Sequence, residues 1–140
     1  MARVRFPDGT TVEAVGIGAR CPDKPDRDYG LYLDHRWKPT WNADVIDWPD
    51  RGVPADSEAA AEAIRQAFER ARRGERVEIG CIGGLGRTGT VLACMAILAG
   101  LPAPEAVAWV RDQYDPGAVE TADQEDWVLW FGAQAGGSPA

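Results

Sequence analysis

The sequence is organised around residues 77–90, which read Val77-Glu78-Ile79-Gly80-Cys81-Ile82-Gly83-Gly84-Leu85-Gly86-Arg87-Thr88-Gly89-Thr90. The alternating apolar residues at its start are typical of a short strand. The glycine-rich turn that follows leads into an apolar helix, which we expect over residues 88–99. The turn therefore lies at a helix N-terminus, where unpaired N–H groups and the helix dipole attract an anion.

The glycines of this turn indicate which anion it takes. Glycine adopts positive φ without steric cost, so the backbone can curl until successive N–H groups point inward. A loop of this length fits an oxyanion the size of phosphate. The residues that we expect to bind phosphate through this loop are Ile82, Gly83, Gly84, Leu85, Gly86 and Arg87.

Three side chains in the same stretch suit phosphate chemistry. Cys81 lies where the helix dipole favours the ionised, nucleophilic thiolate. Arg87 offers a planar fork that can pair with two oxygens of a phosphoryl group. The hydroxyl of Thr88 can donate a hydrogen bond to the thiolate and help it to leave. We therefore interpret Cys81, Arg87 and Thr88 as candidate catalytic residues.

The Cys-x5-Arg-Thr spacing of residues 81–88 resembles the signature of the cysteine-dependent protein-tyrosine and dual-specificity phosphatases. Two further segments agree, in the order found in that family. Residues 48–50, Trp-Pro-Asp, resemble its mobile general-acid loop. Residues 116–124 resemble the segment that carries its water-positioning glutamine. Three motifs in order are far more specific than the first motif alone.

The resemblance implies a single α/β domain with a central, mainly parallel sheet flanked by helices. It also implies metal-independent hydrolysis of phosphotyrosine, with phosphoserine and phosphothreonine as further candidates, and no cofactor. Cys81 would attack phosphorus and form a phosphocysteine, while Asp50 gives a proton to the departing oxygen. Arg87 would hold the developing charge, and Gln124 would place the water that hydrolyses the intermediate.

The chain departs from the family pattern at two positions. Most members carry histidine immediately before the nucleophile, where this chain has Gly80, and the family often has arginine at the position of Asp115. Asp115 is also a rival for the acid, because the low-molecular-weight tyrosine phosphatases use an Asp-Pro acid downstream of the cysteine. Two functions of other classes stay open: a phosphate-binding module without turnover, and a thiol enzyme of the rhodanese or arsenate-reductase kind.

Residues 34–41 form a dense basic and aromatic cluster in an otherwise acidic chain. Arg36 and Lys38 could supply charge, and Trp37 or Trp41 could supply stacking area, to a phosphorylated substrate. The alternative is a surface loop anchored by its tryptophans.

Composition limits the partners that we expect. The formal net charge of −7 and the pI near 4.7 disfavour nucleic acid and anionic membranes. The longest apolar run, residues 91–103, is too short to cross a bilayer, and no signal peptide is evident. Three widely spaced cysteines do not form a disulfide framework, and a nucleophilic thiol suits a reducing cytoplasm. We expect a cytoplasmic monomer that acts on a phosphorylated protein or a small phosphomonoester.

Patterning predicts the remaining elements. Residues 3–6 and 11–15 suggest a hairpin, and residues 29–33 and 43–47 suggest two short strands. Helices are expected over residues 57–73, closed by Gly74, and from Pro104 to Tyr114. Thr121 and Gln124 form a capping box ahead of a further apolar helix. We assign residues 1–131 to the phosphatase domain and residues 132–140 to a flexible tail.

Overall fold

The computed structural model describes residues 2–16, 27–35, 39, 41–81, 83 and 85–136. Within them lies a sheet in the order β1-β2-β5-β3-β4. β1 pairs with β2 antiparallel, and the other neighbours pair in parallel, so the mainly parallel sheet that the sequence predicts is confirmed. The strands are β1 (Ala2–Arg5), β2 (Thr11–Gly16), β3 (Tyr29–Tyr32), β4 (Ala43–Val45) and β5 (Val77–Cys81).

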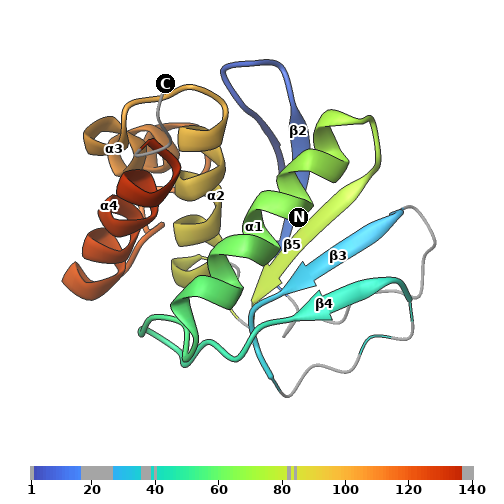
Figure 1. Cartoon of the computed structure of the whole chain (residues 1–140), viewed down its shortest axis with the longest axis horizontal. Coiled ribbons are helices and arrows are strands. Elements are labelled where there is room, and N and C mark those ends of the chain that lie inside the picture. The colour runs from blue at the N-terminus through green and yellow to red at the C-terminus, as the bar shows by residue number, and fades with distance from the viewer. Residues whose placement is uncertain are drawn as a thin grey trace.

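The described helices are α1 (Ser57–Arg72), α2 (Gly86–Leu98), α3 (Ala103–Gln113) and α4 (Ala122–Gly136). They bury their apolar residues in one cluster with one face of the sheet, to which β3 contributes Leu31 and β5 contributes Ile79 and Cys81. In Figure 1, α1 lies across the strands, with α2, α3 and α4 grouped beside it. Successive residues of a strand face opposite sides of the sheet, so Cys81 and the residue before it lie on different faces. No helix in the described part of the chain is long and apolar enough to cross a membrane.

α2 is the innermost helix. All side chains from Gly86 to Ala96 are buried, and α2 contacts each of the other three helices. A helix that is apolar on all sides is stable only when it is enclosed. This explains why the sequence from Val91 onward shows an apolar run without an amphipathic period.

The helix ends follow from local sequence. The Asp56 side chain accepts a hydrogen bond from the N–H of Ala59 at 3.1 Å and caps the N-terminus of α1. At the other end, Gly74 has φ of +94°, and the N–H of Glu75 donates to the carbonyl of Arg70. That pattern is a Schellman motif, in which glycine is strongly favoured, so the predicted closure of this helix by Gly74 is confirmed.

The C-terminal helix extends further than its sequence suggests. Residues 132–136, which we assigned to a flexible tail, belong to α4. Gly132 does not stop the helix because it lies at a close contact with α3: a β-carbon placed on it would be 2.5 Å from Cβ of Ala103. The remainder of the expected tail, residues 137–140, lies outside the described residues.

The other face of the sheet carries a buried ion pair. Nε of Arg27 lies 2.9 Å from a carboxylate oxygen of Glu78, and Tyr32 donates its hydroxyl proton to the same carboxylate. Trp41 donates to the Tyr32 oxygen at 2.9 Å, and its ring lies under the Arg27 guanidinium. A buried carboxylate needs such partners, so β5 is anchored on the face opposite Cys81.

The N-cap of α1 gives a first prediction. Replacing Asp56→Ala removes the acceptor for the Ala59 N–H, and the free energy of unfolding should fall by about 1 kcal/mol. Urea denaturation would measure this loss. Asp56→Asn, which keeps an acceptor, serves as the matched control and should stay close to the wild type. Equal losses in the two variants would show that Asp56 acts through its charge and not as a hydrogen-bond acceptor.

The three tyrosines of the chain give a second prediction. Burial raises the pKa of Tyr29 and Tyr32, and the carboxylates of Asp44 and Glu78 raise it further. Burial, followed by the negative charges of Cys81 and Asp115, raises the pKa of Tyr114 to about 12. Tyrosinate absorbance should therefore be absent in the folded protein at the pH of about 10 where free tyrosine ionises.

The sign of the linkage follows from these raised values. The neutral phenols contribute stability that is complete below about pH 10 and is lost as pH rises through the folded-state pKa values. Ionisation and unfolding should coincide in a joint absorbance and circular dichroism titration, whereas the urea-unfolded chain should titrate near pH 10. Ionisation of the folded protein near that pH would contradict this prediction.

Candidate active site

Cys81 is the last residue of the central strand β5, and its side chain is 2% exposed. Strand alternation turns it toward the helices, where it belongs to the apolar cluster. The hydroxyl of Thr88 donates to its Sγ at 3.1 Å, as the sequence predicts. The nucleophile candidate thus lies at the carboxyl end of the sheet, directly before the N-terminus of α2.

The start of α2 can offer backbone donors. The helix begins at Gly86, and its N-cap residue, Leu85, makes no side-chain capping hydrogen bond. The first N–H groups of a helix have no partner within the helix, so this end suits an anion. We call residues 81–86 the Cys81 loop. Ile82 and Gly84 lie outside the described residues, so the inward orientation of all the loop amides stays a prediction.

Arg87 is buried, with 3% of its surface exposed, and ties several segments together. Its Nη1 donates to the carbonyl oxygens of Leu33 and Trp48, both at 2.9 Å, and lies 3.4 Å from the Asp34 carboxylate. Nη2 lies 3.7 Å from Oδ1 of Asp50. The guanidinium is therefore fixed beside the Cys81 loop and faces the loop that follows β4.

We call that loop, residues 46–56, the Trp48 loop. The Trp48 ring is buried against Trp127 at a centroid distance of 5.3 Å, and its Nε1 donates to the carbonyl of Gly52 at 2.7 Å. Gly52 N–H donates back to Pro49, which closes a turn with Arg51 at φ of +63°. The tip of this turn presents Asp50, with 73% of its side chain exposed.

Gln124 is fully buried and both ends of its amide are bonded. Its Oε1 accepts from the N–H of Glu120 at 2.7 Å, and its Nε2 donates to the carbonyl of Gly52 at 3.1 Å. Thr121 accepts from the N–H of Gln124, so half of the predicted capping box is present. In this structure the amide fastens the Trp48 loop to the start of α4, and the water-placing role of Gln124 stays a prediction.

A family model described as protein-tyrosine phosphatase matches residues 33–124, which include Asp34, Trp48, Cys81, Arg87 and Gln124. The chain belongs to the protein-tyrosine phosphatase family. The resemblance seen in the sequence is thereby confirmed.

The chain is also similar to individual proteins. The uncharacterized protein MJ0215 of Methanocaldococcus jannaschii is 34% identical over 114 residues, which cover 72% of this chain and 68% of that protein. The protein-tyrosine-phosphatase PTP1 of Arabidopsis thaliana is 36% identical over 86 residues, which cover 56% of this chain and 25% of that protein. The crystal structure of Tk-PTP in the active form has a TM-score of 0.72 and 27% identity, covering 94% of this chain and 97% of that one.

The segment between α3 and α4, which includes part of the third motif, packs closely against the start of α2 and forms a wall there. Ala118 packs on Gly89 so closely that a β-carbon on that glycine would lie 2.9 Å from Cα of Ala118. The Glu120 carboxylate similarly covers Gly86. Arg111 holds this wall by donating to the carbonyls of Ala118 and Val119.

Asp115, the rival acid, has a local partner. Its Oδ1 accepts from the N–H of Gly117 at 2.7 Å, which is the geometry of an Asx turn. Asp50, by contrast, faces Arg87 directly. The assignment of Asp50 rather than Asp115 as the proton donor stays a prediction.

Other candidates lie outside the site or outside the described residues. Arg36, Trp37 and Lys38 are not among the described residues, so their contact with substrate stays a prediction. The neighbouring His35 lies 3.5 Å from Asp47, and both side chains are exposed. Nowhere in the described ranges do three His, Cys, Asp or Glu side chains gather as metal ligands would.

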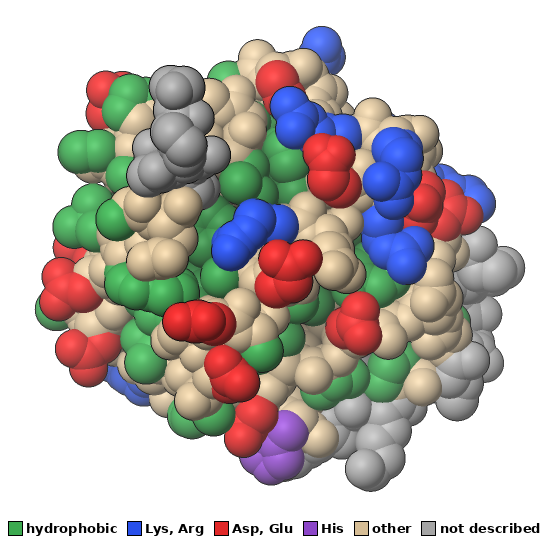
Figure 2. Space-filling model, in the orientation of Figure 1, with side chains coloured by type: hydrophobic (Ala, Val, Ile, Leu, Met, Phe, Trp, Pro, Cys, Tyr) green, Lys and Arg blue, Asp and Glu red, His purple; other side chains and the backbone are tan. Residues whose placement is uncertain are grey.

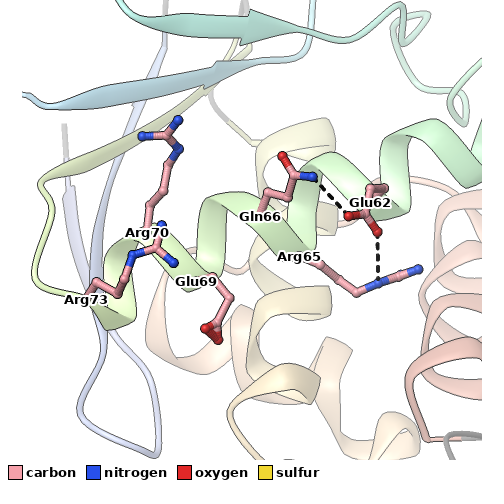
Figure 3. Close-up of a pocket in the computed structure, with 6 residues that line it drawn as sticks. All are labelled: Glu62, Arg65, Gln66, Glu69, Arg70 and Arg73. Carbon is pink, nitrogen blue, oxygen red and sulfur yellow. Dashed lines mark hydrogen bonds and ion pairs between the residues drawn. The ribbon is translucent and has the colours of Figure 1, made fainter.

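A depression of about 330 Å³ lies on the exposed face of α1, away from this chemistry (Figure 3). Basic and acidic side chains alternate over this part of the surface (Figure 2). Arg65 lies 3.8 Å from Glu62, and Arg70 lies 3.0 Å from Glu75. Such exposed pairs contribute little and leave no concentrated charge. The depression is lined by Glu62, Arg65, Gln66, Glu69, Arg70 and Arg73.

The close contact at Gly89 gives a third prediction. In Gly89→Ala the new methyl group meets the backbone of Ala118, so the free energy of unfolding should fall by about 1–3 kcal/mol. The control is Gly83→Ala, because a β-carbon there meets nothing within 4 Å. It should change stability by no more than about 0.5 kcal/mol. If Gly89→Ala were as stable as the wild type, the segment at Ala118 would be able to shift at no cost in free energy, which would contradict this prediction.

Proposed function

We propose that this chain hydrolyses phosphotyrosine in proteins through a phosphocysteine on Cys81, without a metal ion or another cofactor. The observation that carries the proposal is the thiol of Cys81, bonded by the Thr88 hydroxyl at the uncapped N-terminus of α2. Such a helix end can receive the oxyanion that the thiolate attacks. Membership of the protein-tyrosine phosphatase family supports the same chemistry.

In the first step the Cys81 sulfur attacks phosphorus and the bond from phosphorus to the ester oxygen breaks. Asp50, in its protonated form, gives its proton to the departing oxygen, so that the alcohol or phenol leaves neutral. Charge develops on the three phosphoryl oxygens. In the proposed reaction Arg87 and the amides of the Cys81 loop stabilise that charge.

In the second step a water molecule attacks the phosphorus of the phosphocysteine. Asp50, now a carboxylate, takes a proton from this water while the sulfur–phosphorus bond breaks. Inorganic phosphate forms and Cys81 returns as a thiolate, which accepts the Thr88 hydrogen bond again. In the structure the Gln124 side chain is bonded to the Gly52 carbonyl of the Trp48 loop. That loop would have to move before the Gln124 amide could reach this water.

The fourth prediction compares Cys81→Ser and Asp50→Asn with the wild type on phenyl phosphate and a phosphotyrosine peptide, with a chelator present. Cys81→Ser should lose activity by at least about 10⁴-fold, because the nucleophile is gone. Asp50→Asn should lower kcat by about 10²- to 10³-fold. Asp47→Asn is the matched control, since it makes the same charge change in the same loop, and it should retain activity.

The outcomes separate the proposed function from its alternatives. Activity that survives Cys81→Ser, or that the chelator abolishes, would contradict the phosphocysteine route. A wild type that binds phosphate but turns nothing over would favour a phosphate-binding module. Indifference to Asp50→Asn would favour a rhodanese-like or arsenate-reductase-like enzyme. Phosphoserine and phosphothreonine peptides in the same assay define the range of substrates.

A further inference from the structure

The Glu120 carboxylate stands at the same helix end that the proposed function gives to phosphate. A β-carbon placed on Gly86 would lie 2.7 Å from the carboxyl carbon of Glu120 and 2.9 Å from its Cγ. Gly86 is the first residue of α2, and the N-cap before it supplies no side-chain acceptor. A negative side chain at a site for a phosphate dianion works against binding, so its placement calls for an explanation.

The backbone that leads to Glu120 is held in an unusual conformation. Val119, the residue before Glu120, has φ of +61°, a conformation that a β-branched residue rarely adopts. Such a conformation persists only where its surroundings determine it. Arg111 supplies two of the restraints, with Nε donating to the Ala118 carbonyl at 2.9 Å and Nη2 donating to the Val119 carbonyl at 2.7 Å. On the other side, the N–H of Glu120 donates to Gln124.

The charge of Glu120 has little compensation. Within the described residues no cation forms an ion pair with it, and the guanidinium of Arg111 pairs with Glu125 at 3.2 Å instead. Arg87 is directed to Leu33, Trp48, Asp34 and Asp50. In the free protein the carboxylate is favourable beside the positive end of α2. Once phosphate occupies that end, the two anions repel each other.

We propose that Glu120 lowers the affinity of the Cys81 loop for phosphate, and that Arg111 is the positioning residue that holds Glu120 in place. The inference rests on the proposed function, because the oxyanion site is the same. It assigns Glu120 a role in releasing the product, since the carboxylate beside Gly86 repels the inorganic phosphate left by each turnover. The affinity for the phosphoryl group then depends on two opposing contributions. Arg87 and the loop amides attract the group, and the Glu120 carboxylate repels it.

The test measures binding of inorganic phosphate to the full chain by calorimetry at neutral pH and low ionic strength. Glu120→Gln should bind phosphate about 3- to 10-fold more tightly than the wild type, and added salt should narrow the difference. Product inhibition should strengthen by the same factor. Glu125→Gln is the matched control, because it removes an equal charge that contacts Arg111 and not the Cys81 loop. It should leave phosphate affinity unchanged.

Arg111→Lys tests the positioning role while it keeps the positive charge. Lysine lacks the planar fork that reaches both carbonyls, so Glu120 is released and phosphate should bind more tightly. Adding Arg111→Lys to Glu120→Gln should give no further gain, because the two residues act as a unit. If Arg111 were only a structural support, its replacement would weaken phosphate binding in both backgrounds, and the positioning role would be overturned.

The remaining outcomes separate a failure of this inference from a failure of the proposed function on which it rests. If phosphate binds to the wild type and Glu120→Gln binds it equally or less tightly, the inference alone is overturned. A fall in kcat at unchanged phosphate affinity would also overturn it, since Glu120 would then act on the attacking water. If the wild type binds no phosphate at all, the proposed function and the inference are both overturned.

Discussion

The guanidinium of Arg87 is a buried cation, and the arrangement around the Cys81 loop depends on how it is neutralised. A charge removed from water is tolerated only with close partners. Here those partners are the carbonyls of Leu33 and Trp48 and the carboxylate of Asp34. One group therefore joins the end of β3, the Trp48 loop and the first turn of α2. Its donors are oriented before any ligand arrives, which is the condition for effective electrostatic stabilisation.

The rest of the site is held in a similar way, by side chains that bond to distant backbone. Gln124 reaches Gly52 across 72 positions of sequence, and Arg111 fastens the segment before α4 to α3. The sheet and α2 provide a rigid frame, and the loops at its edge provide the chemistry. The glycines at positions 86 and 89 allow these loops to approach α2 closely, so the wall at Ala118 and Glu120 is a feature of packing as much as of hydrogen bonding.

The elements of the fold could be predicted because their signals are local. Alternation identified β5, helical spacing identified α1, and Gly74 marked its end. The motif spacing placed Cys81, Thr88 and Arg87 together, as the structure has them. Glu120 and Arg111 could not be found in this way, since their roles depend on contacts between segments far apart in the chain. Residues 132–136 of α4 were assigned to a flexible tail for the same reason, because the close contact of Gly132 with Ala103 depends on the packing of α3 on α4.

The anchoring of the Trp48 loop limits how far its tip can travel. Trp48 is held against Trp127, and the Gly52 carbonyl accepts hydrogen bonds from both Trp48 and Gln124. Only residues 49–51 lie between these fixed points, and each spans at most about 3.6 Å. Proline also restricts the first of the three. Asp50 can thus move only a short distance relative to Trp48 and Gly52. For the proposed reaction, this short reach limits the separation between the sulfur of Cys81 and the carboxyl of Asp50, and so limits the length of the phosphorylated side chain that fits between them.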